Sequence, residues 1–221
     1  MTASAGIDER ALRIAAGAAV LHGDLRMPRS PAGLVLFAHG SGSSRRSVRN
    51  RFVAEILNDA GIATLLFDLL TEAEEAIDLR TRQLRFDIEL LIRRLSMTTA
   101  WVLADDDLGS MPLGYFGAST GAAAALGASC EHPEVRAVVS RGGRPDLAGP
   151  LLGHVRAATL LIVGGDDYGV IELNEQALAR LQCEARLEIV PGATHLFEEP
   201  GTLEQAARLA ADWFAAHLPA P

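Results

Sequence analysis

"GYFGASTGAAAAL", residues 114–126, joins an apolar run to an alanine-rich tract through five residues in the pattern Gly-x-Ser-x-Gly. The apolar run predicts a buried strand, and the alanines favour a helix directly after it. A chain that turns this sharply from strand to helix needs small residues at both glycine positions, where larger side chains would collide with the backbone. The stretch therefore predicts a tight turn that exposes Ser119 at the edge of a sheet.

The rest of the chain alternates between the same two kinds of element. Residues 11–28 predict two short antiparallel strands around the turn signal at Gly17. Further strands are expected at 32–40, 62–70, 113–117, 135–140, 158–165 and 185–192, with a short segment around Trp101. Helices are expected at 48–60, about 78–96, 120–130, 171–182 and 202–217. This order predicts an α/β fold, with a mostly parallel sheet covered by helices on both faces.

Composition narrows the class of protein. The 221 residues suit a single domain, with residues 1–10 as a candidate disordered tail. A net charge of −8 and the lack of a basic stripe argue against a nucleic-acid partner. The N-terminus does not resemble a secretory signal, and no apolar run is long enough to span a membrane. We therefore expect a cytoplasmic protein without a membrane partner.

A catalytic role for Ser119 requires two further residues. A serine hydroxyl is a weak nucleophile unless a base removes its proton, and that base needs an orienting acid. Asp166 and Asp167 follow the strand at 158–165, and His195 follows the strand at 185–192. Because carboxyl ends of parallel strands meet at one edge of a sheet, all three chemical groups are expected there.

Each of these residues also has a plainer interpretation. Ser119 could simply fill a tight turn, the two aspartates could form a solvated turn, and His195 could cap a helix. Their joint occurrence after three different strands favours the catalytic interpretation. Two backbone amides complete the predicted site: Thr120 at the start of a helix, and Ser41 in the glycine-rich stretch "FAHGSGSS". These amides predict an oxyanion hole.

Four stretches together resemble the dienelactone-hydrolase-like branch of the α/β-hydrolase superfamily: "FAHGSGSS", "GYFGASTGAAAAL", "LLIVGGDD" and "PGATHLFEEPG". The resemblance covers about residues 32–217. It implies the three-layer α/β-hydrolase fold, with about eight strands of which the second is antiparallel. It also implies ester hydrolysis through an acyl-enzyme, and it selects Asp167 over Asp166 as the acid.

Two features of the family do not carry over. The namesake dienelactone hydrolases use cysteine as the nucleophile, whereas Ser119 stands at that position here, so the resemblance does not imply a dienelactone substrate. Some relatives are joined to a phosphoribosyltransferase domain, which would need more sequence than these 221 residues.

The predicted function is a serine hydrolase that cleaves small soluble carboxylic esters or lactones. Ser119 is the expected nucleophile, His195 the general base and Asp167 the orienting acid. This chemistry requires no metal or organic cofactor. Two alternatives stay open: a non-catalytic homologue that binds a small ligand, and an acyltransferase or perhydrolase that uses the same three residues.

The sequence says less about the substrate. Gly40 and Arg141 are candidate substrate contacts, and Arg141 could instead form an ion pair at the rim of the site. Short connections between elements leave little chain for a large lid, which favours small substrates, with an anionic group left open. A homo-oligomer is also left open.

Several polar residues near the predicted site have structural interpretations. His39 is expected to hold the glycine-rich loop by hydrogen bonds rather than to act as a second base. Arg45, Arg46 and Arg49 either line the mouth of the site or form a solvated helix face, and the solvated face is favoured. Asp68 is an alternative acid to which the resemblance gives no role.

Overall fold

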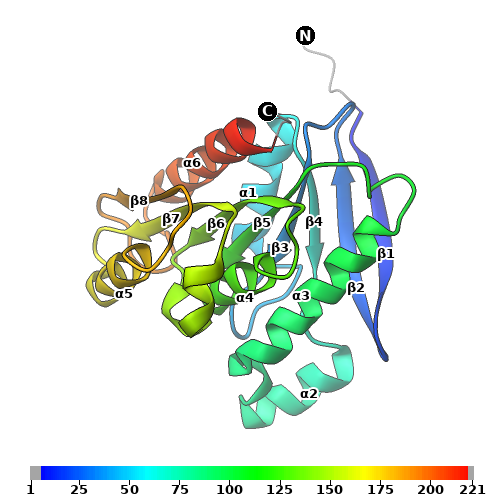
Figure 1. Cartoon of the computed structure of the whole chain (residues 1–221), viewed down its shortest axis with the longest axis horizontal. Coiled ribbons are helices and arrows are strands. Elements are labelled where there is room, and N and C mark those ends of the chain that lie inside the picture. Colours follow the sequence, from blue (N-terminus) through cyan, green and yellow to red (C-terminus); the bar gives the residue numbers. More distant parts are fainter. Residues whose placement is uncertain (1–5, 219–221) are drawn as a thin grey trace.

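The structure is a computed structural model that describes residues 6–218 (Figure 1). It contains one eight-stranded sheet in the order β1-β2-β4-β3-β5-β6-β7-β8. The strands are β1 (Asp8–Ala16), β2 (Ala19–Met27), β3 (Leu34–Ala38), β4 (Ala63–Phe67), β5 (Leu113–Ala118), β6 (Val135–Arg141), β7 (Ala158–Gly164) and β8 (Ala185–Val190). The helices are α1 (Val48–Asp59), α2 (Glu72–Thr81), α3 (Ile88–Leu103), α4 (Thr120–Ser129), α5 (Tyr168–Leu178) and α6 (Thr202–His217), with 3₁₀ segments η1 (Leu84–Phe86) and η2 (Pro145–His154). The predicted α/β-hydrolase fold is confirmed.

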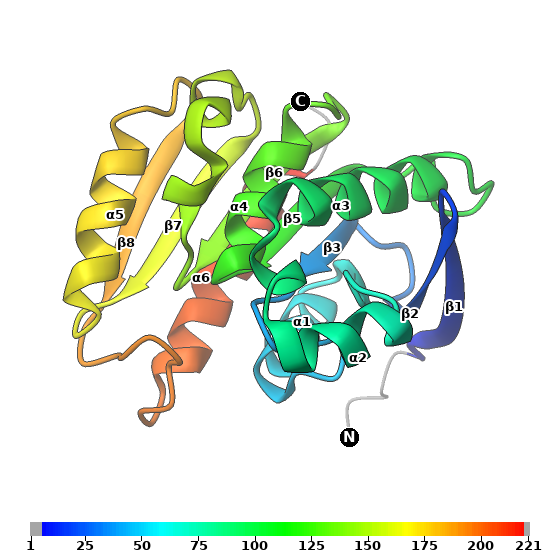
Figure 2. The ribbon, with the colours of Figure 1, turned by 90° about the horizontal axis from the view of Figure 1, so that it is seen from below.

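The direction of the strands brings their carboxyl ends to one edge of the sheet. β1 and β2 form an antiparallel hairpin around Gly17, and β2 is also antiparallel to β4. All other neighbouring strands are parallel. Figure 2 shows the sheet from below, from β8 and β7 on the left to β1 on the right. The loops after β3, β5, β6, β7 and β8 therefore share the edge at which α/β sheets bind ligands.

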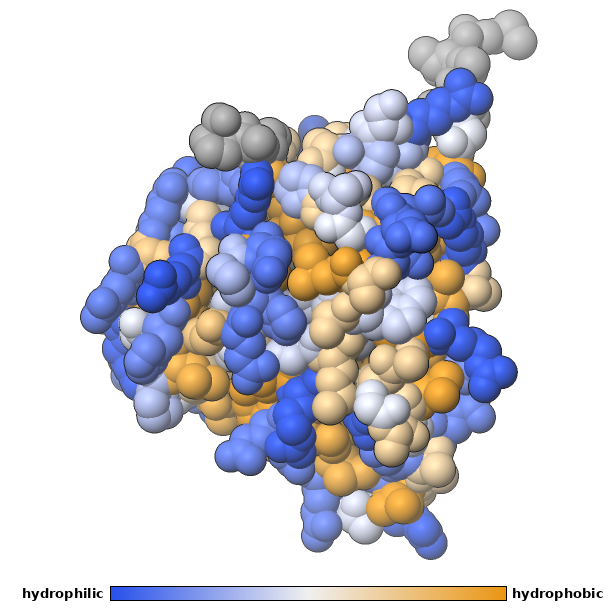
Figure 3. All heavy atoms as spheres, turned by 45° about the vertical axis from the view of Figure 1, so that its right-hand side comes forward, coloured by the Kyte–Doolittle hydropathy of each residue, from blue (hydrophilic) through white to orange (hydrophobic). Residues whose placement is uncertain are grey.

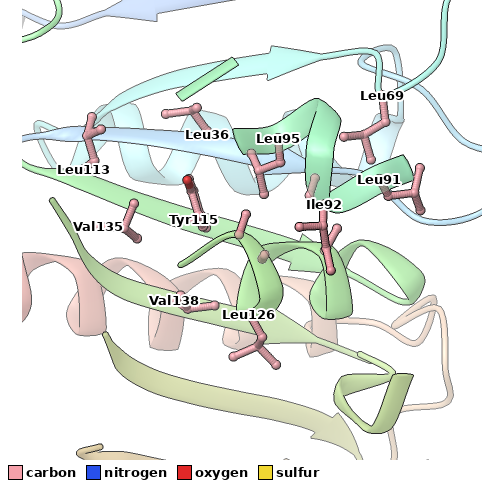
Figure 4. Close-up of a cluster of buried hydrophobic side chains, with 14 of the residues drawn as sticks. Leu36, Leu69, Leu91, Ile92, Leu95, Leu113, Tyr115, Leu126, Val135 and Val138 are labelled. Carbon is pink, nitrogen blue, oxygen red and sulfur yellow. The ribbon is translucent and has the colours of Figure 1, made fainter. Parts of the chain in front are cut away.

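Helices cover both faces of the sheet. α1 and α6 pack together on one face, and α3, α4 and α5 lie on the other (Figure 1). β5 serves both layers, because alternate side chains of a strand point to opposite faces. Tyr115 packs in the cluster under α3 and α4, shown in Figure 4, while Phe116 packs under α1 and α6. The buried Tyr115 hydroxyl lies 2.6 Å from Thr99 Oγ1, so its polar end is satisfied.

The predicted helix at 78–96 is wrong. The structure divides this region into α2, η1 and α3, and Trp101 lies inside α3 rather than in a separate segment. Thr71 and Glu74 form a capping box that starts α2, and Arg82 ends it in the left-handed conformation, with a φ of 57°. Asp87 then caps α3 by accepting the Leu90 amide at 2.9 Å. Local capping overrides the apparent continuity of the apolar pattern.

Other boundaries move by a few residues. Residues 8–10 belong to β1, so the expectation of a disordered tail over 1–10 is wrong for these residues. Residues 1–5 of that tail lie outside the described part of the chain. The long connection at 141–157 contains η2, and α5 begins at Tyr168, earlier than the predicted 171.

The surface mixes polar and apolar side chains. On the face seen in Figure 3, hydrophobic residues form several separate groups surrounded by hydrophilic ones. Over residues 6–218, none of the helices combines the length and the hydropathy needed to cross a membrane.

Candidate active site

Ser119 occupies the turn between β5 and α4. Its φ of 52° and ψ of −122° put a non-glycine residue in a sparsely populated region of backbone conformation. Such a conformation costs about 1–3 kcal/mol and persists only where its surroundings enforce it. The Ser119 amide donates to the Arg141 carbonyl at 3.3 Å, and the Ser119 carbonyl accepts the Arg144 amide at 3.0 Å. The end of β6 and the loop after it thus hold the strained residue in place.

The glycines of the turn are required by close backbone approach. A Cβ at Gly117 would lie 2.5 Å from the Cα of Ala122, and a Cβ at Gly121 would lie 2.1 Å from the carbonyl oxygen of Ala38. Real Cβ atoms do not come this close to backbone. Residues 117–121, the elbow, therefore need glycine at both ends because α4 packs directly on β5 and β3.

The predicted oxyanion amides lie on two adjoining segments. Residues 39–47, the oxyanion loop, follow β3 and touch the elbow, because a Cβ at Gly40 would lie 3.0 Å from the Cβ of Ser119. Thr120 is the first residue of α4, where the helix leaves amide donors unpaired. Within residues 6–218, neither the Ser41 nor the Thr120 amide donates a hydrogen bond. Both donors remain available to a ligand.

His195 and Asp167 form a hydrogen-bonded pair. His195 Nδ1 lies 2.7 Å from Asp167 Oδ2, and the two side chains are 39% and 17% exposed. Because a carboxylate only accepts, Nδ1 carries the proton and Nε2 keeps a free lone pair. Asp166 is exposed instead, and Tyr168 approaches it at 3.4 Å. The structure thus pairs the histidine with Asp167, the aspartate that the resemblance selected.

The segments of Ser119 and His195 both approach the end of β6. A Cβ at Gly142 would lie 3.7 Å from His195 Cε1, while Ser119 bonds to the preceding residue, Arg141. In the described part of the chain, the Ser119 hydroxyl has no hydrogen-bond partner, so it is not bonded to His195 Nε2. Catalytic hydrogen bonds are often loose without substrate and tighten when it binds.

His39 holds the oxyanion loop, as predicted. Its Nε2 accepts the Leu69 amide at 3.1 Å, so Nδ1 carries the proton and donates to the Gly40 carbonyl at 3.0 Å. The ring is buried, and burial lowers its pKa below the ordinary value of 6.5. The carboxylates of Asp68 and Glu75 act in the opposite direction but do not reverse the effect. The neutral ring ties the ends of β3 and β4 together.

This arrangement predicts a loss of stability in mild acid. The unfolded chain takes up the His39 proton near pH 6.5, whereas the folded chain resists it, so the contribution is complete above that pH and is lost below it. Below about pH 6.5, the free energy of unfolding should fall by up to about 1.4 kcal/mol per pH unit from this group. Urea titrations at several pH values should show that the free energy of unfolding depends less steeply on pH in His39→Gln than in the wild type. The glutamine amide oxygen can replace Nε2 as the acceptor of the Leu69 amide. Equal slopes would contradict the prediction.

The arginines after the oxyanion loop take different roles. Arg45 forms a short ion pair with Asp68, so this aspartate is engaged away from His195 and is not its partner. Arg49 pairs with Glu198 at 3.1 Å, and Arg46 is exposed. The favoured prediction of a solvated face holds for Arg46 and for Arg49, whose bond to Glu198 is exposed, but not for Arg45, which is 18% exposed and fixes the loop.

A pocket beside the oxyanion amides shows residues that sequence reasoning missed. It is lined by the oxyanion loop, the segment after β4, α2, η1, α3 and Thr120. Arg85 of η1 donates from Nε to the buried carboxylate of Asp78, while its Nη1 lies 2.9 Å from where a Cβ on Gly42 would be. The wall that α2 and η1 form was not predicted, although the expectation that the connections are too short for a large lid is untouched by it. No signal marked Arg85, which lay inside the single predicted helix.

Arg141 is buried and does not occupy the rim position that was one of its two predicted roles. It is 7% exposed, and among residues 6–218 no carboxylate forms an ion pair with it, so it is not a rim residue. Alternation along β6 explains the burial, because Arg141 shares a face with Val139, the face that α1 covers. Nη2 donates to Asn50 Oδ1 at 3.3 Å.

The described residues hold no group of three or more histidine, cysteine or acidic side chains arranged to bind a metal ion. The polar groups at the site suit acyl chemistry: a strained serine, a histidine whose Nδ1 is held by Asp167, and two amides without an acceptor among residues 6–218.

Individual relatives, rather than a family model, show which proteins this chain is similar to. No family model matches the chain. A curated protein of Mycobacterium tuberculosis (strain ATCC 25618 / H37Rv), "Putative phosphoribosyl transferase Rv0571c", is 59% identical over 211 residues, which cover 95% of this chain and 47% of that protein. The chain thus spans about half the length of the curated relatives it matches.

Solved structures extend the comparison to whole chains. Est1E from Butyrivibrio proteoclasticus has a TM-score of 0.75 at 15% identity, covering 93% of this chain and 99% of that one, and it shares the fold. The dienelactone hydrolase from Anabaena variabilis ATCC 29413 has a TM-score of 0.94 at 58% identity, covering 96% of this chain and 99% of that one. Identity at this level along nearly the whole of both chains means that this protein belongs to the dienelactone hydrolase family of α/β-hydrolases.

Proposed function

We propose that the protein is a serine hydrolase that cleaves small soluble carboxylic esters or lactones. The observation that carries the proposal is the 2.7 Å hydrogen bond between His195 and Asp167, next to a serine held in a strained turn. The bond occupies His195 Nδ1 and leaves Nε2 to accept the Ser119 proton in the proposed reaction. Family membership supports hydrolase chemistry in general.

The proposed reaction has two halves. Ser119 Oγ attacks the ester carbonyl as His195 Nε2 takes its proton, and Asp167 stabilises the imidazolium. The amides of Ser41 and Thr120 stabilise the negative oxygen, an effect worth about 2.7–4 kcal/mol for each donor in comparable sites. His195 then protonates the departing alcohol. Water repeats the sequence on the acyl-enzyme and releases the acid.

The pocket supports a small acyl group. Its apolar wall consists of Leu69, Leu70, Leu79 and Leu91, and its polar wall includes the serines of the oxyanion loop. Arg85 is the cation of this pocket, with Nε held by Asp78 and Nη1 facing the oxyanion loop. We assign to Arg85 the recognition of an acidic group on the acyl side, a role that the buried Arg141 cannot fill.

Arg85→Lys should separate anionic from neutral substrates. Lysine keeps a positive charge beside Asp78, whose side chain is 2% exposed. It lacks an equivalent of Nη1, the guanidinium nitrogen that lies beside Gly42. KM for a nitrophenyl monoester of succinic acid should rise about tenfold, the value of one lost charge-assisted hydrogen bond. KM for nitrophenyl butyrate, the matched neutral ester, should stay within about twofold. Equal changes for both esters would remove Arg85 from substrate recognition.

The proposed function is tested by trapping the acyl-enzyme. Wild-type protein is mixed with nitrophenyl butyrate and quenched in acid, and a second sample is treated with a fluorophosphonate. Peptide mass spectrometry should find both adducts on Ser119, with about one nitrophenol released per protein in the initial burst. Turnover with an adduct elsewhere would overturn the assignment of Ser119. Absence of both turnover and adduct would favour the ligand-binding alternative.

Acyl transfer to another acceptor and perhydrolysis use the same three residues, and competition between water, alcohols and peroxide for the acyl-enzyme would separate them.

The name of the mycobacterial relatives describes a phosphoribosyl transferase, but this chain matches only about half of their length, and we assign it acyl chemistry. We also propose a cytoplasmic location.

A further inference from the structure

Arg141 is a buried cation, and none of the carboxylates within residues 6–218 forms an ion pair with it. Its side chain lies between the sheet and α1, with one hydrogen bond to Asn50 and with Nη1 unpartnered among residues 6–218. Burial, together with the nearby charge of Arg49, lowers the pKa of Arg141 to about 10, so the side chain is still charged at neutral pH. Burying an unpaired charge opposes folding. The residue therefore calls for a reason other than stability.

The contacts of Arg141 join both catalytic segments. Its guanidinium carbon lies 5.9 Å from the ring centre of Phe116 and 5.9 Å from that of Phe197. Phe116 is three residues before Ser119 in β5, and Phe197 is two residues after His195. A cation over an aromatic face is attracted to it, most strongly where water is excluded. One side chain thus binds the segment of the nucleophile to the segment of the base.

The backbone of Arg141 reinforces this link. Its carbonyl oxygen accepts the Ser119 amide, and the next residue, Gly142, packs against His195. Phe197 has a φ of 56°, so the segment that carries His195 is itself held in an unfavourable conformation. Phe116 also stacks on Phe37, with ring centres 4.8 Å apart, and Phe37 precedes the oxyanion loop.

We propose that Arg141 is a positioning residue, which acts through Phe116 and Phe197 to hold the His195 segment, residues 191–201, in register with the Ser119 elbow. The inference rests on the serine hydrolase function proposed above. Arg141 does not touch the substrate in this role. Its guanidinium is a rigid plane that can contact two aromatic rings at once. Its positive charge adds a cation–π attraction that an apolar side chain would lack.

The central test is Arg141→Met, which keeps an unbranched apolar stem and removes the guanidinium and its charge. We expect kcat for nitrophenyl butyrate to fall about 100-fold, the usual effect of a small displacement of catalytic groups, with KM within about twofold. The free energy of unfolding should stay the same or rise, because the unpaired charge is gone. A merely structural residue would show the opposite: stability and activity would fall together.

Two further variants show whether the effect passes through Phe197. Phe197→Leu should lower kcat as Arg141→Met does, and the double variant should be no worse than the poorer single one, because both changes break the same contact. Arg141→Lys should recover part of the lost kcat, since an ammonium also binds aromatic faces. Additive losses in the double variant would mean that Arg141 does not act through Phe197.

A readout without substrate keeps this test separate from the proposed function. Amide hydrogen exchange, followed by mass spectrometry, should be at least about tenfold faster in residues 191–201 of Arg141→Met and unchanged in α3. If the wild type fails to turn over esters but the exchange changes as expected, the function is wrong and the positioning role stands. An active wild type with unchanged kcat in Arg141→Met would overturn the inference. So would a rise in KM confined to the anionic ester, since Arg141 would then contact the substrate.

Discussion

Ser119→Ala should lower kcat for nitrophenyl butyrate about 10⁶-fold, as expected when the nucleophile of a catalytic triad is removed. Alanine keeps the Cβ that packs against Gly40 and leaves the hydrogen bond between His195 and Asp167 in place. The fold and the ligand pocket should therefore survive, and only the attacking oxygen is lost. Initial rates and the nitrophenol burst measure the effect directly.

The matched control is Ser96→Ala, which removes a serine hydroxyl from the surface of α3, where it bonds to Glu131. Its kcat should stay within about twofold of the wild type. Unfolding midpoints for both variants exclude a general loss of structure. If Ser119→Ala kept more than about a hundredth of the activity, water activated by His195 could act as the nucleophile, and the elbow would serve only as an oxyanion donor.

The sequence carried enough information for the elbow because its constraint is local. Gly117 and Gly121 approach neighbouring backbone so closely that there is no room for a Cβ. The two glycines of the pattern Gly-x-Ser-x-Gly are the direct consequence of this close approach. The parallel strands are continuous apolar runs, so strand order along the chain and the shared edge could also be predicted. His195 and Asp167 then had to meet there.

The pocket wall could not be predicted in the same way. Residues 72–103 have an apolar pattern that suits one helix and a following segment, and the division into α2, η1 and α3 depends on two caps. The capping box at Thr71 was visible as a Thr-x-x-Glu pattern, but the role of Arg85 arises only from tertiary contacts with Asp78 and Gly42. Side chains that come together from distant segments have no fixed spacing in the sequence, so a sequence pattern does not predict their contact.

Arg141 shows a different limit. The sequence placed it correctly at the end of a strand, yet the direction of its side chain depends on the register of β6. A shift of one residue along a strand exchanges its two faces, and that choice separates a residue in the cleft from one beneath α1. The register follows from the packing of Val139 and Ala137 under α6, which requires the whole sheet.

Asp167→Asn should lower kcat for nitrophenyl butyrate about 10⁴-fold, as in other triads where the acid becomes an amide. The Asp167 carboxylate, 2.7 Å from His195 Nδ1, accepts the hydrogen bond of the Nδ1 proton. An asparagine can turn its NH₂ group toward the ring, and this group would donate to an Nδ1 that carries no proton. His195 would then carry its proton on Nε2 and could not accept one from Ser119. The amide also fails to stabilise the imidazolium as it forms.

Asp166→Asn is the matched control, because it makes the same change one residue away. Asp166 is exposed, and its side chain accepts one hydrogen bond, from Tyr168 at 3.4 Å, among the described residues, so kcat should stay within about twofold. The pair of variants also tests the family resemblance, which selected Asp167 from two adjacent aspartates. If Asp166→Asn were the damaging change, the turn after β7 would rearrange in solution. If neither variant lost activity, His195 would act without an orienting acid, since Asp68 is held by Arg45.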